Sequence, residues 1–333
     1  MAIVGATGAV GQEFLSLFES RNFPVGTLRL LASAHSVGKT IPFKGAEVPV
    51  EEATSEAFGG IDVAFFSAGA TRSKALVPAA LKAGALVVDN SSAFRMQPEV
   101  PLVVPEINLD AVAPRGKLVA VPNCTAILLC MALQPLRALG TIERIVVSTY
   151  QSASGGGAAV MEELRESTRA YLEGREFTPK AIPHPYAFNL FSHNTPVGPD
   201  GANEEETKVV EESRKILGMP GLRANVTCVR VPVLRAHCES VTVEFAEAAP
   251  SEAAVSETLA AAPGVRVVDD RAGNHFPMPV EASGGGDVLV GRIRRDPSNE
   301  RGLCLFLSGD QLLKGAALNA VQIAEAVIAR DGI

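Results

Sequence analysis

The chain has 333 residues, of which 30 are Lys or Arg and 37 are Asp or Glu, so its formal net charge is −7. This length suggests two domains, and the 47% content of hydrophobic residues is typical of a globular protein. The pI near 5.4 leaves no excess of cations to meet phosphates, so we expect neither a nucleic-acid partner nor a membrane-surface partner.

The sequence favours a cytoplasmic protein. The longest apolar run, residues 126–133, is too short to cross a bilayer, and no basic segment followed by an apolar stretch marks a secretory signal at the N-terminus. The number of cysteines is odd, and no two form a CxxC pair. We therefore expect neither a disulfide framework nor a structural metal site. The five cysteines are Cys124, Cys130, Cys228, Cys238 and Cys304.

Strands and helices alternate in the first 123 residues, a pattern typical of parallel βαβ units. The predicted strands are continuously apolar, as strands buried on both faces should be. They cover residues 2–4, 28–31, 63–66 and 85–88, and helices are predicted over 10–19 and 73–83. This part of the chain is therefore expected to be a Rossmann-like, doubly wound domain.

From Cys124 onward the pattern changes to longer strands with fewer crossover helices. The strand at 240–247 alternates apolar and polar residues, which favours a mixed or antiparallel sheet. Other strands are predicted at 142–150, 226–231, 288–293 and 303–307, and helices at 125–139, 155–172, 204–217, 252–262 and 310–330. The chain is expected to be an α/β protein with a dinucleotide-binding domain over 1–123 and an α+β domain over 124–309. The final helix, within 310–333, is expected to pack back onto the first domain.

Three glycines lie at the start of the first βα unit. Gly5, Gly8 and Gly11 follow a predicted strand and open a predicted helix. Such glycines permit a tight turn and a close approach to a pyrophosphate, while the helix N-terminus offers N–H groups. The pattern predicts a dinucleotide site; the alternative is a turn that only packs helix on strand.

The end of the second predicted strand bears on the choice of cofactor. NAD-binding domains usually carry an acidic residue there for the ribose 2′-hydroxyl. Residues 33–36 read Ser-Ala-His-Ser, and Lys39 follows. The missing carboxylate favours NADP.

Cys124 follows Pro122 and Asn123 and opens an apolar helix. A helix N-terminus favours the thiolate form of a cysteine, which suits a nucleophile. The alternative is a small buried residue, as we expect for Cys130, Cys228 and Cys304.

Other candidate residues follow strand ends or share a helix face. Gln151 begins a second glycine-rich turn after a strand, and Arg230 and His237 lie seven residues apart across a strand junction. Glu205 and Lys208 are three apart on a predicted helix, where a solvated pair is the simpler interpretation. Arg95 follows the strand at 85–88, at the end where open α/β sheets bind ligands.

These segments together resemble aspartate-semialdehyde dehydrogenases over essentially the whole chain. The matching motifs are GATGAVG at 5–11, DNSSAFRM at 89–96, VPNCTA at 121–126, YQSASGGG at 150–157, EEETK at 204–208, CVRVPVLRAH at 228–237 and GDQLLKGAA at 309–317. The resemblance implies a second domain like that of glyceraldehyde-3-phosphate dehydrogenase. It also implies a reversible, NADPH-dependent reductive dephosphorylation of L-aspartyl 4-phosphate to L-aspartate 4-semialdehyde, on the route to lysine, diaminopimelate, threonine and methionine.

The resemblance also assigns roles to residues. Cys124 would form the acyl-enzyme thioester, His237 would be the general acid/base, and Gln151 would orient the acyl group. Substrate and inorganic phosphate would contact Arg95, Asn123, Glu205, Lys208 and Arg230. The cofactor would contact Thr7, Gly8, Ala9, Val10, Gly11, His35, Ser36, Ser67, Ser154, Gly155 and Gln311.

One departure from the family pattern and two alternative functions stay open. Many relatives carry arginine where this chain has His35, and a mostly neutral imidazole is a weaker partner for a 2′-phosphate, so use of NAD remains possible. A related acyl-phosphate reductase, such as N-acetyl-glutamyl-phosphate reductase, would share the glycine loop and the nucleophile. A non-catalytic NADP-binding sensor would leave Cys124 unreactive. The resemblance further implies a homodimer formed through the second domain.

Overall fold

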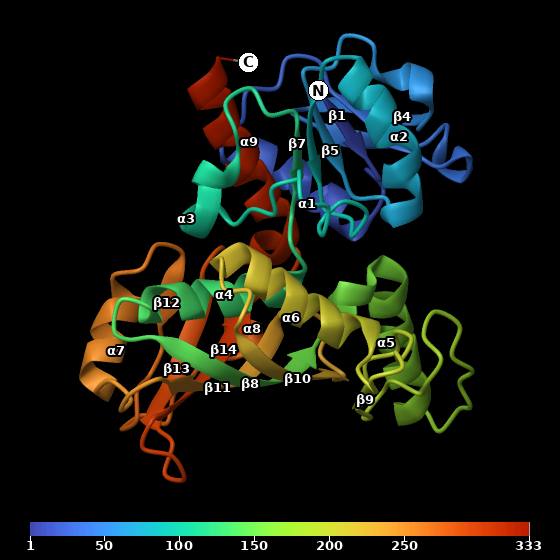
Figure 1. Cartoon of the computed structure of the whole chain (residues 1–333). Coiled ribbons are helices and arrows are strands. Elements are labelled where there is room, and N and C mark those ends of the chain that lie inside the picture. Colours follow the sequence, from blue (N-terminus) through green and yellow to red (C-terminus); the bar gives the residue numbers. More distant parts are fainter. Residues whose placement is uncertain (333) are drawn as a thin grey trace. The chain divides into compact units, whose positions relative to one another are not determined.

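The computed structural model describes residues 1–332, which form two compact units (Figure 1). One unit contains Met1–Asn123 together with the C-terminal segment from Ala316, and the other contains Cys124–Gly315. Each unit has a seven-stranded sheet of its own. No helix within residues 1–332 is long and apolar enough to cross a membrane.

The sheet of the first unit is parallel except for a hairpin at one edge, and its strand order is β3-β4-β2-β1-β5-β6-β7. From β1 the chain continues to β2 on one side and later to β5 on the other, so the strand order reverses at β1. Open α/β sheets bind ligands at such a point. The strands are β1 (Ala2–Val4), β2 (Arg29–Ala32), β3 (Thr40–Phe43), β4 (Ala46–Glu52), β5 (Val63–Phe66), β6 (Leu86–Asp89) and β7 (Leu118–Ala120).

Helices and aromatic side chains cover this sheet. The helices are α1 (Ala9–Ser20), α2 (Ala70–Lys82), α3 (Pro105–Asn108) and α9 (Leu318–Asp331). Figure 1 shows α9 beside α1, and Arg21 of α1 pairs with Glu325 of α9 at 2.6 Å. The final helix was predicted to begin at residue 310, but a π-helical turn occupies Leu313–Ala317 and α9 begins only after it.

The second unit has a mixed sheet with the order β12-β13-β14-β11-β8-β10-β9. The strands are β8 (Ile142–Gln151), β9 (Phe191–Ser192), β10 (Arg223–Arg230), β11 (His237–Phe245), β12 (Val265–Val267), β13 (Val288–Arg295) and β14 (Gly302–Gly309). The helices are α4 (Cys124–Leu136), α5 (Ala158–Leu172), α6 (Glu204–Leu217), α7 (Glu252–Ala260) and α8 (Pro279–Ala282). The predicted fold class, a Rossmann-like domain followed by a domain with a mixed sheet, is confirmed.

The two faces of the second sheet differ in burial. Alternate residues of β8 and β11, such as Val147 and Val241, are buried on the face of the sheet that α4 and α6 cover, whereas Val146 and Thr242 on the opposite face are half-buried (Figure 1). This alternation is the two-residue period of a sheet with one covered face.

The strand register places polar side chains in two rows on the covered face. Arg230 of β10 pairs with Gln151 of β8, and the β8–β11 register continues the row to His237. Because side chains alternate along a strand, the residues two positions away form a parallel row on the same face. We call the first set, Arg230, Gln151 and His237, the first polar row. The second polar row consists of His193, Cys228, Thr149 and Glu239.

Candidate active site

The candidate nucleophile lies at the first residue of α4. Cys124 is half-buried, and one helical turn later Leu128 fills the space above Gly309 of β14, where a Cβ would come within 2.5 Å of the leucine side chain. Gly309 pairs directly with His237. The missing side chain at Gly309 therefore allows α4 to approach the sheet beside the first polar row.

A second glycine supports Cys124 from the other side. A Cβ on Gly315 would lie 2.8 Å from the Cβ of Cys124 and 3.3 Å from its Cα. Contacts this close to the backbone can be relieved only by movement of the chain. Gly315 lies in the π-helical turn, so the backbone of this turn packs directly against Cys124.

His237 is fully buried, and the turn after β8 fixes its orientation. The backbone N–H of Ser152 donates to Nδ1 of His237 at 3.1 Å, and the Ser152 hydroxyl lies 3.0 Å from the same nitrogen. A nitrogen that accepts from a backbone N–H must offer a lone pair, so the neutral ring carries its proton on Nε2. Nε2 is sealed from solvent and has no hydrogen-bond partner within residues 1–332.

Burial and a neighbouring cation keep His237 neutral. The pKa of His237 is lowered to about 3, mainly by burial and then by the charge of Arg230. Nη1 of Arg230 donates to the Ser152 carbonyl at 3.1 Å, while its Nε is buried without a partner among the described residues. Two buried donors without a partner among residues 1–332 thus lie in one row of the sheet. Native structures leave few such groups, so a polar ligand is the expected partner.

The glycine-rich turn covers both of these residues. A Cβ on Gly155 would lie 3.0 Å from Cε1 of His237 and 3.1 Å from Nη1 of Arg230, so only glycine fits here without displacing them. Gln311 links this turn to the start of β11: its Nε2 donates to Oγ of Ser154, and its Oε1 accepts from the N–H of Ala236 at 3.0 Å. Ser154 and Gln311 thus tie the glycine-rich turn to the backbone next to His237.

Helix α6 brings acidic and basic side chains to the same end of the sheet. Glu205 is buried and accepts a hydrogen bond from Nε2 of Gln151 at 3.1 Å. A capping box between Asn203 and Glu206 begins the helix, and Glu206 also accepts from the N–H of Cys228 at 3.0 Å. These bonds fasten the first turn of α6 to β10 and so fix the position of Glu205.

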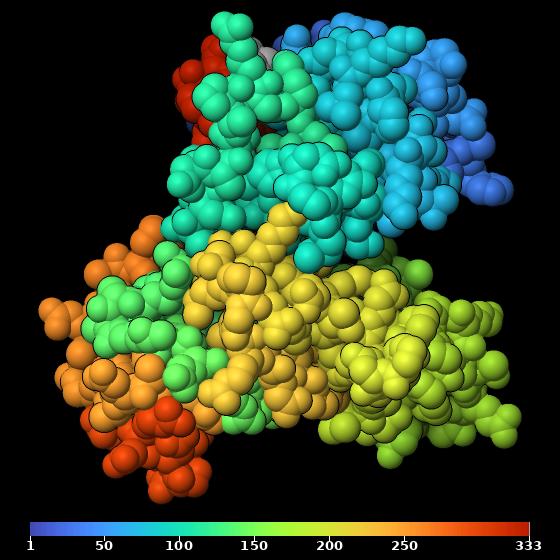
Figure 2. All heavy atoms as spheres, in the orientation of Figure 1, coloured from blue at the N-terminus to red at the C-terminus, as the bar shows by residue number. Residues whose placement is uncertain are grey.

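The spacing of Glu205 and Lys208 suggested an ion pair on α6, but Lys208 pairs with a different glutamate. Its Nζ lies 2.8 Å from the carboxylate of Glu204, one turn earlier on α6. Both residues of this pair are partly exposed, and α6 reaches the surface of the second unit (Figure 2). A partly exposed i,i+4 pair contributes little free energy, so an anionic ligand could readily replace Glu204 as the partner of Lys208.

In the first unit, the glycines of the first loop differ in their roles. Gly5 has a φ of +95°, and a Cβ there would come within 2.4 Å of the Ser67 carbonyl; a Cβ on Gly11 would meet the carbonyl of Gly5 at 2.4 Å. The protein itself therefore requires both of these glycines. Gly8 is exposed, and its hypothetical Cβ comes no closer than 3.3 Å to another atom, so it leaves room for a ligand at the N-terminus of α1. This arrangement fits the pyrophosphate of a dinucleotide.

The remaining predicted cofactor residues of the first unit lie around the same strand ends. Ser36 is buried 3.5 Å from the hydroxyl of Thr7, whereas His35 is exposed on the short 3₁₀ turn that follows β2. Ser67 follows β5 and donates its N–H to the carbonyl of Val4. Ala9 and Val10 form the first turn of α1, whose N–H groups have no partner within the helix.

Arg95 and Asn123, two of the predicted substrate residues, are both buried in the first unit. Nε of Arg95 donates to the carbonyl of Val121 at 2.9 Å, and Nη2 donates to the carbonyl of Asn90 at 2.7 Å. These bonds hold the guanidinium against the segment that ends at Asn123.

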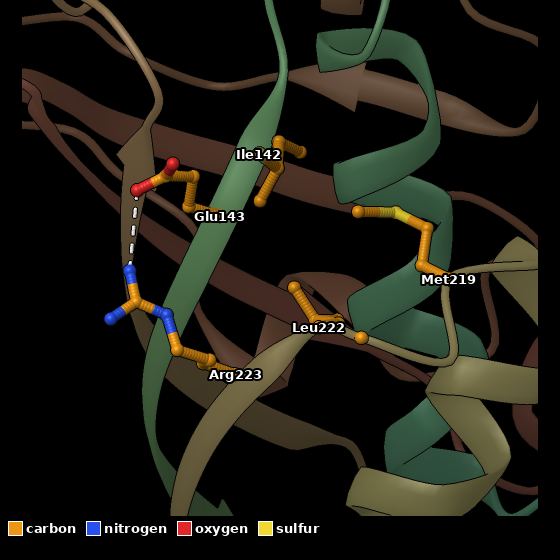
Figure 3. Close-up of a pocket in the computed structure, with 6 residues that line it drawn as sticks. Ile142, Glu143, Met219, Leu222 and Arg223 are labelled. Carbon is orange, nitrogen blue, oxygen red and sulfur yellow. Dashed lines mark hydrogen bonds and ion pairs between the residues drawn. The ribbon is translucent and has the colours of Figure 1, made fainter.

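A surface pocket in the second unit lies away from these residues. It is lined by Ile142, Leu222 and Met219, and Glu143 pairs with Arg223 at its edge at 3.2 Å (Figure 3). Ile142 and Arg223 begin their strands, whereas the first polar row lies where β8 and β10 end. The pocket is therefore at the opposite end of the sheet.

All five cysteines are free thiols. Burial raises the pKa of Cys130 to about 12 and of Cys238 to about 11, and it raises the pKa of Cys228 further still. Cys304 was expected in the core, but it is half-buried on the less covered face of the second sheet.

The geometry agrees with comparisons to known proteins. Residues 1–114 match the family model described as "Semialdehyde dehydrogenase, NAD binding domain", and residues 133–314 match "Semialdehyde dehydrogenase, dimerisation domain". An aspartate-semialdehyde dehydrogenase of Synechocystis sp. is 54% identical over 330 residues, which cover 99% of this chain and 97% of the relative. The chain belongs to the aspartate-semialdehyde dehydrogenase family. The family, the oxidoreductase class with a NAD(P)-binding domain, and the place in aspartate-pathway amino-acid biosynthesis, all predicted from the sequence, are confirmed.

Solved structures of this family have the same fold. Aspartate semialdehyde dehydrogenase II from Vibrio cholerae is 40% identical, with a TM-score of 0.94 over 100% of this chain and 98% of that one. A second structure of the same enzyme, with the same score, identity and coverage, is described as complexed with ASA.

The sequence analysis missed residues that the structure brings to the site. Thr149, Ser152 and Gly315 hold Gln151, His237 and Cys124 respectively. His193 and Glu239 are buried in the second polar row. The strand register or a backbone contact brings each of these five residues close to a predicted site residue. No local sequence motif distinguishes them.

Proposed function

We propose that this chain reduces L-aspartyl 4-phosphate to L-aspartate 4-semialdehyde through a thioester on Cys124, and that it also catalyses the reverse reaction. The observation that carries this proposal is the first polar row: buried His237 and Arg230, each with a nitrogen that lacks a partner among residues 1–332, beside the helix that begins at Cys124. A substrate carboxylate and an acyl oxygen would provide the hydrogen-bond acceptors that these two donors lack.

Each residue has a role that its surroundings support. The thiolate of Cys124 attacks the acyl phosphate at the positive end of α4. Arg230 holds the α-carboxylate with its guanidinium, and Glu205 holds the α-ammonium. Gln151 is fixed between Thr149 and Glu205, at 3.1 Å from each, and orients the acyl group. Arg95 and Lys208 bind the phosphate, with Asn123 next to the nucleophile.

The tautomer of His237 defines its part in the reaction. Because Nδ1 accepts from the backbone, Nε2–H can donate to the acyl oxygen while negative charge develops there. The same nitrogen protonates the oxyanion of the hemithioacetal after reduction. It takes the hydroxyl proton back when the C–S bond breaks, which forms the aldehyde and releases the Cys124 thiolate. His237 therefore acts first as an acid and then as a base, both times through Nε2.

A bound nicotinamide cofactor would supply the hydride that reduces the thioester. Thr7, Gly8, Ala9, Val10 and Gly11 would hold its pyrophosphate, and Ser36 and Ser67 lie at the neighbouring strand ends. In the second unit, Ser154, Gly155 and Gln311 would complete the contacts.

We propose NADP as the preferred cofactor. The chain after β2 offers Ser36, Lys39 and the exposed imidazole of His35, and it has no carboxylate at residues 33–36. We expect kcat/KM to be higher with NADP than with NAD, because a carboxylate would be needed to hold a free 2′-hydroxyl. Steady-state kinetics with both cofactors checks this, and equal or better use of NAD would contradict it.

We also infer a homodimer formed through the second unit and a cytoplasmic location. The matched dimerisation domain covers this sheet, whose less covered face presents Val146, Tyr150 and Phe306. The rings of Tyr150 and Phe306 lie 6.1 Å apart, and together with Val146 they give this face apolar area that a second copy could bury. Free thiols at all five cysteines fit a reducing compartment.

The function is tested by aldehyde oxidation. Aspartate semialdehyde, NADP and inorganic phosphate should together give NADPH, measured by its absorbance, and omission of phosphate should stop the reaction. N-acetyl-glutamate semialdehyde should react poorly, since Glu205 is placed for a charged amine. Preference for the acetylated substrate would favour the related reductase. Failure of aspartate semialdehyde to protect Cys124 from alkylation would favour a non-catalytic sensor.

The buried neutral state of His237 predicts a pH effect on stability. The pKa of His237 is about 3 in the fold and near 6.5 in the unfolded chain, so below pH 6.5 only the unfolded chain takes up the proton. Stability is therefore lost as the pH falls from 7 to 5, by about 2 kcal/mol from this group. Denaturant titrations at both pH values should show a smaller loss in His237→Asn. An equal loss in both proteins would contradict the assignment.

His237→Asn should also lower kcat more than it changes KM, because the proton-transfer group is lost while the substrate contacts stay. Steady-state kinetics with varied aspartate semialdehyde measures this, and a change in KM alone would contradict an acid/base role.

A further inference from the structure

A second buried histidine, His193, lies beside the residues proposed to bind the substrate. It follows β9, and its backbone N–H donates to the carbonyl of Cys228 at 2.8 Å, which extends the pairing of β9 with β10. Its side chain therefore belongs to the second polar row, opposite Cys228 and diagonal to Arg230 on the neighbouring strand. It is 7% exposed.

The hydrogen bonds of Thr195 determine which nitrogen of His193 carries the proton. Nδ1 of His193 lies 3.2 Å from the hydroxyl of Thr195. That hydroxyl accepts the N–H of Glu205 at 3.2 Å and donates its own proton to Oδ1 of Asn203 at 3.5 Å. We assign the hydroxyl proton to Asn203, whose amide oxygen can only accept, so that the hydroxyl accepts from Nδ1 of His193. Nε2 is then a lone-pair acceptor, and it makes no hydrogen bond to any residue from 1 to 332.

Charges from two elements surround this imidazole. The pKa of His193 is lowered to about 4, mainly by burial and then by the charges of Arg230 on β10 and Lys208 on α6. Glu205 and Glu204 on α6 oppose this shift. The ring is consequently neutral near pH 7 and keeps its acceptor. Arg230, Glu205 and Lys208 are the residues proposed for the carboxylate, ammonium and phosphate of the substrate, and all three act on this one ring.

An α-ammonium offers three N–H donors. One oxygen of Glu205 already accepts from Gln151, so a second neutral acceptor next to Glu205 would complete its hydrogen bonds. We propose that His193 determines specificity for the free α-amino group, with its Nε2 accepting a hydrogen bond from the substrate ammonium beside Glu205. This inference rests on the proposed function, because it concerns the amino-acid end of the same substrate.

The test compares two substrates and three variants of the full-length enzyme. The substrates are aspartate semialdehyde and 4-oxobutanoate, which has the same chain without the amino group and serves as a competitive inhibitor if it is not turned over. We expect His193→Ala to raise KM for aspartate semialdehyde about 10- to 100-fold, the loss of one hydrogen bond to a charged group. The KM or inhibition constant of 4-oxobutanoate should stay within about twofold, because it has no ammonium to lose.

Two conservative variants separate the two nitrogens. A glutamine amide reaches about as far as Nε2, so His193→Gln should restore most of the affinity for aspartate semialdehyde. An asparagine amide reaches only the position of Nδ1, so His193→Asn should keep the bond to Thr195 without restoring it. Any other order of the two variants overturns the proposal, as does an equal loss for both substrates in His193→Ala. A wild-type enzyme inactive on aspartate semialdehyde would instead overturn the proposed function.

Discussion

Replacing Cys124 by alanine should abolish turnover while leaving the fold intact. The proposed thioester forms on this sulfur. Cys130, six residues later on the same helix, cannot replace it, because that thiol is fully buried with a pKa of about 12. Removing a nucleophile that forms a covalent intermediate commonly costs more than about 10⁴-fold in kcat. The measurement is phosphate-dependent NADPH formation from aspartate semialdehyde, together with mass spectrometry of enzyme quenched during turnover.

Cys130→Ala is the matched control for this prediction. It removes one buried sulfur from the same helix, so a loss of stability of about 1 kcal/mol is expected with near-normal kcat. Equal losses of activity in the two variants, or an acyl adduct on any residue other than Cys124, would contradict the assignment.

The position of the sulfur can be tested apart from its identity. A methyl group at Gly315 would lie 2.8 Å from the Cβ of Cys124, so Gly315→Ala must displace the nucleophile by several tenths of an ångström. A displaced reacting group should lower kcat by about 10- to 100-fold. Gly221→Ala serves as control, because a Cβ there meets no atom within 4 Å.

The sequence predicts best what local chemistry decides. The start of α4 follows from Pro122 and Asn123 before an apolar run, and the boundary of α6 follows from Asn203 and Gly218. Strands buried on both faces, such as β5 and β6, are continuous apolar runs. These helix boundaries and strands depend on residues that are close together in the sequence, so a short segment is enough to predict them.

Elements that depend on long-range pairing escape such analysis. The hairpin of β3 and β4 contains Pro42 and Pro49 and several charges, which are tolerated because β3 lies at the edge of its sheet. The two residues of β9 form a strand only because Arg230 and Val229 pair with them. This pairing also brings His193 to the site, so no local motif distinguishes that histidine from the others.

The candidate site shows the same division. Arg230 and His237 could be singled out by their spacing, yet Gln151 lies between them only because β8 pairs with both β10 and β11. The bond from Ser152 to Nδ1 of His237, which decides the tautomer, comes from backbone geometry. Register and backbone contacts are properties of the folded sheet, which the linear sequence does not display.

Arg230→Lys should raise KM for aspartate semialdehyde by about 100-fold, with a smaller change in kcat. Arginine can present two parallel N–H donors to a carboxylate, and lysine replaces this fork by a single point charge. The substitution also removes the donor to the carbonyl of Ser152, which lies 3.1 Å from Nη1, so the backbone that orients His237 loses one contact. Steady-state kinetics with varied aldehyde at fixed NADP and phosphate measures both effects.

Arg223→Lys is the appropriate control, since Arg223 begins the same strand. Its guanidinium pairs with Glu143 beside the surface pocket, at the far end of β10 (Figure 3). The exposed ion pair contributes little free energy, so KM and kcat should both stay near those of the unmodified enzyme. If Arg230→Lys also behaves like the unmodified enzyme, the carboxylate does not bind at the first polar row. A loss confined to kcat would instead mean that Arg230 acts only through Ser152 and His237.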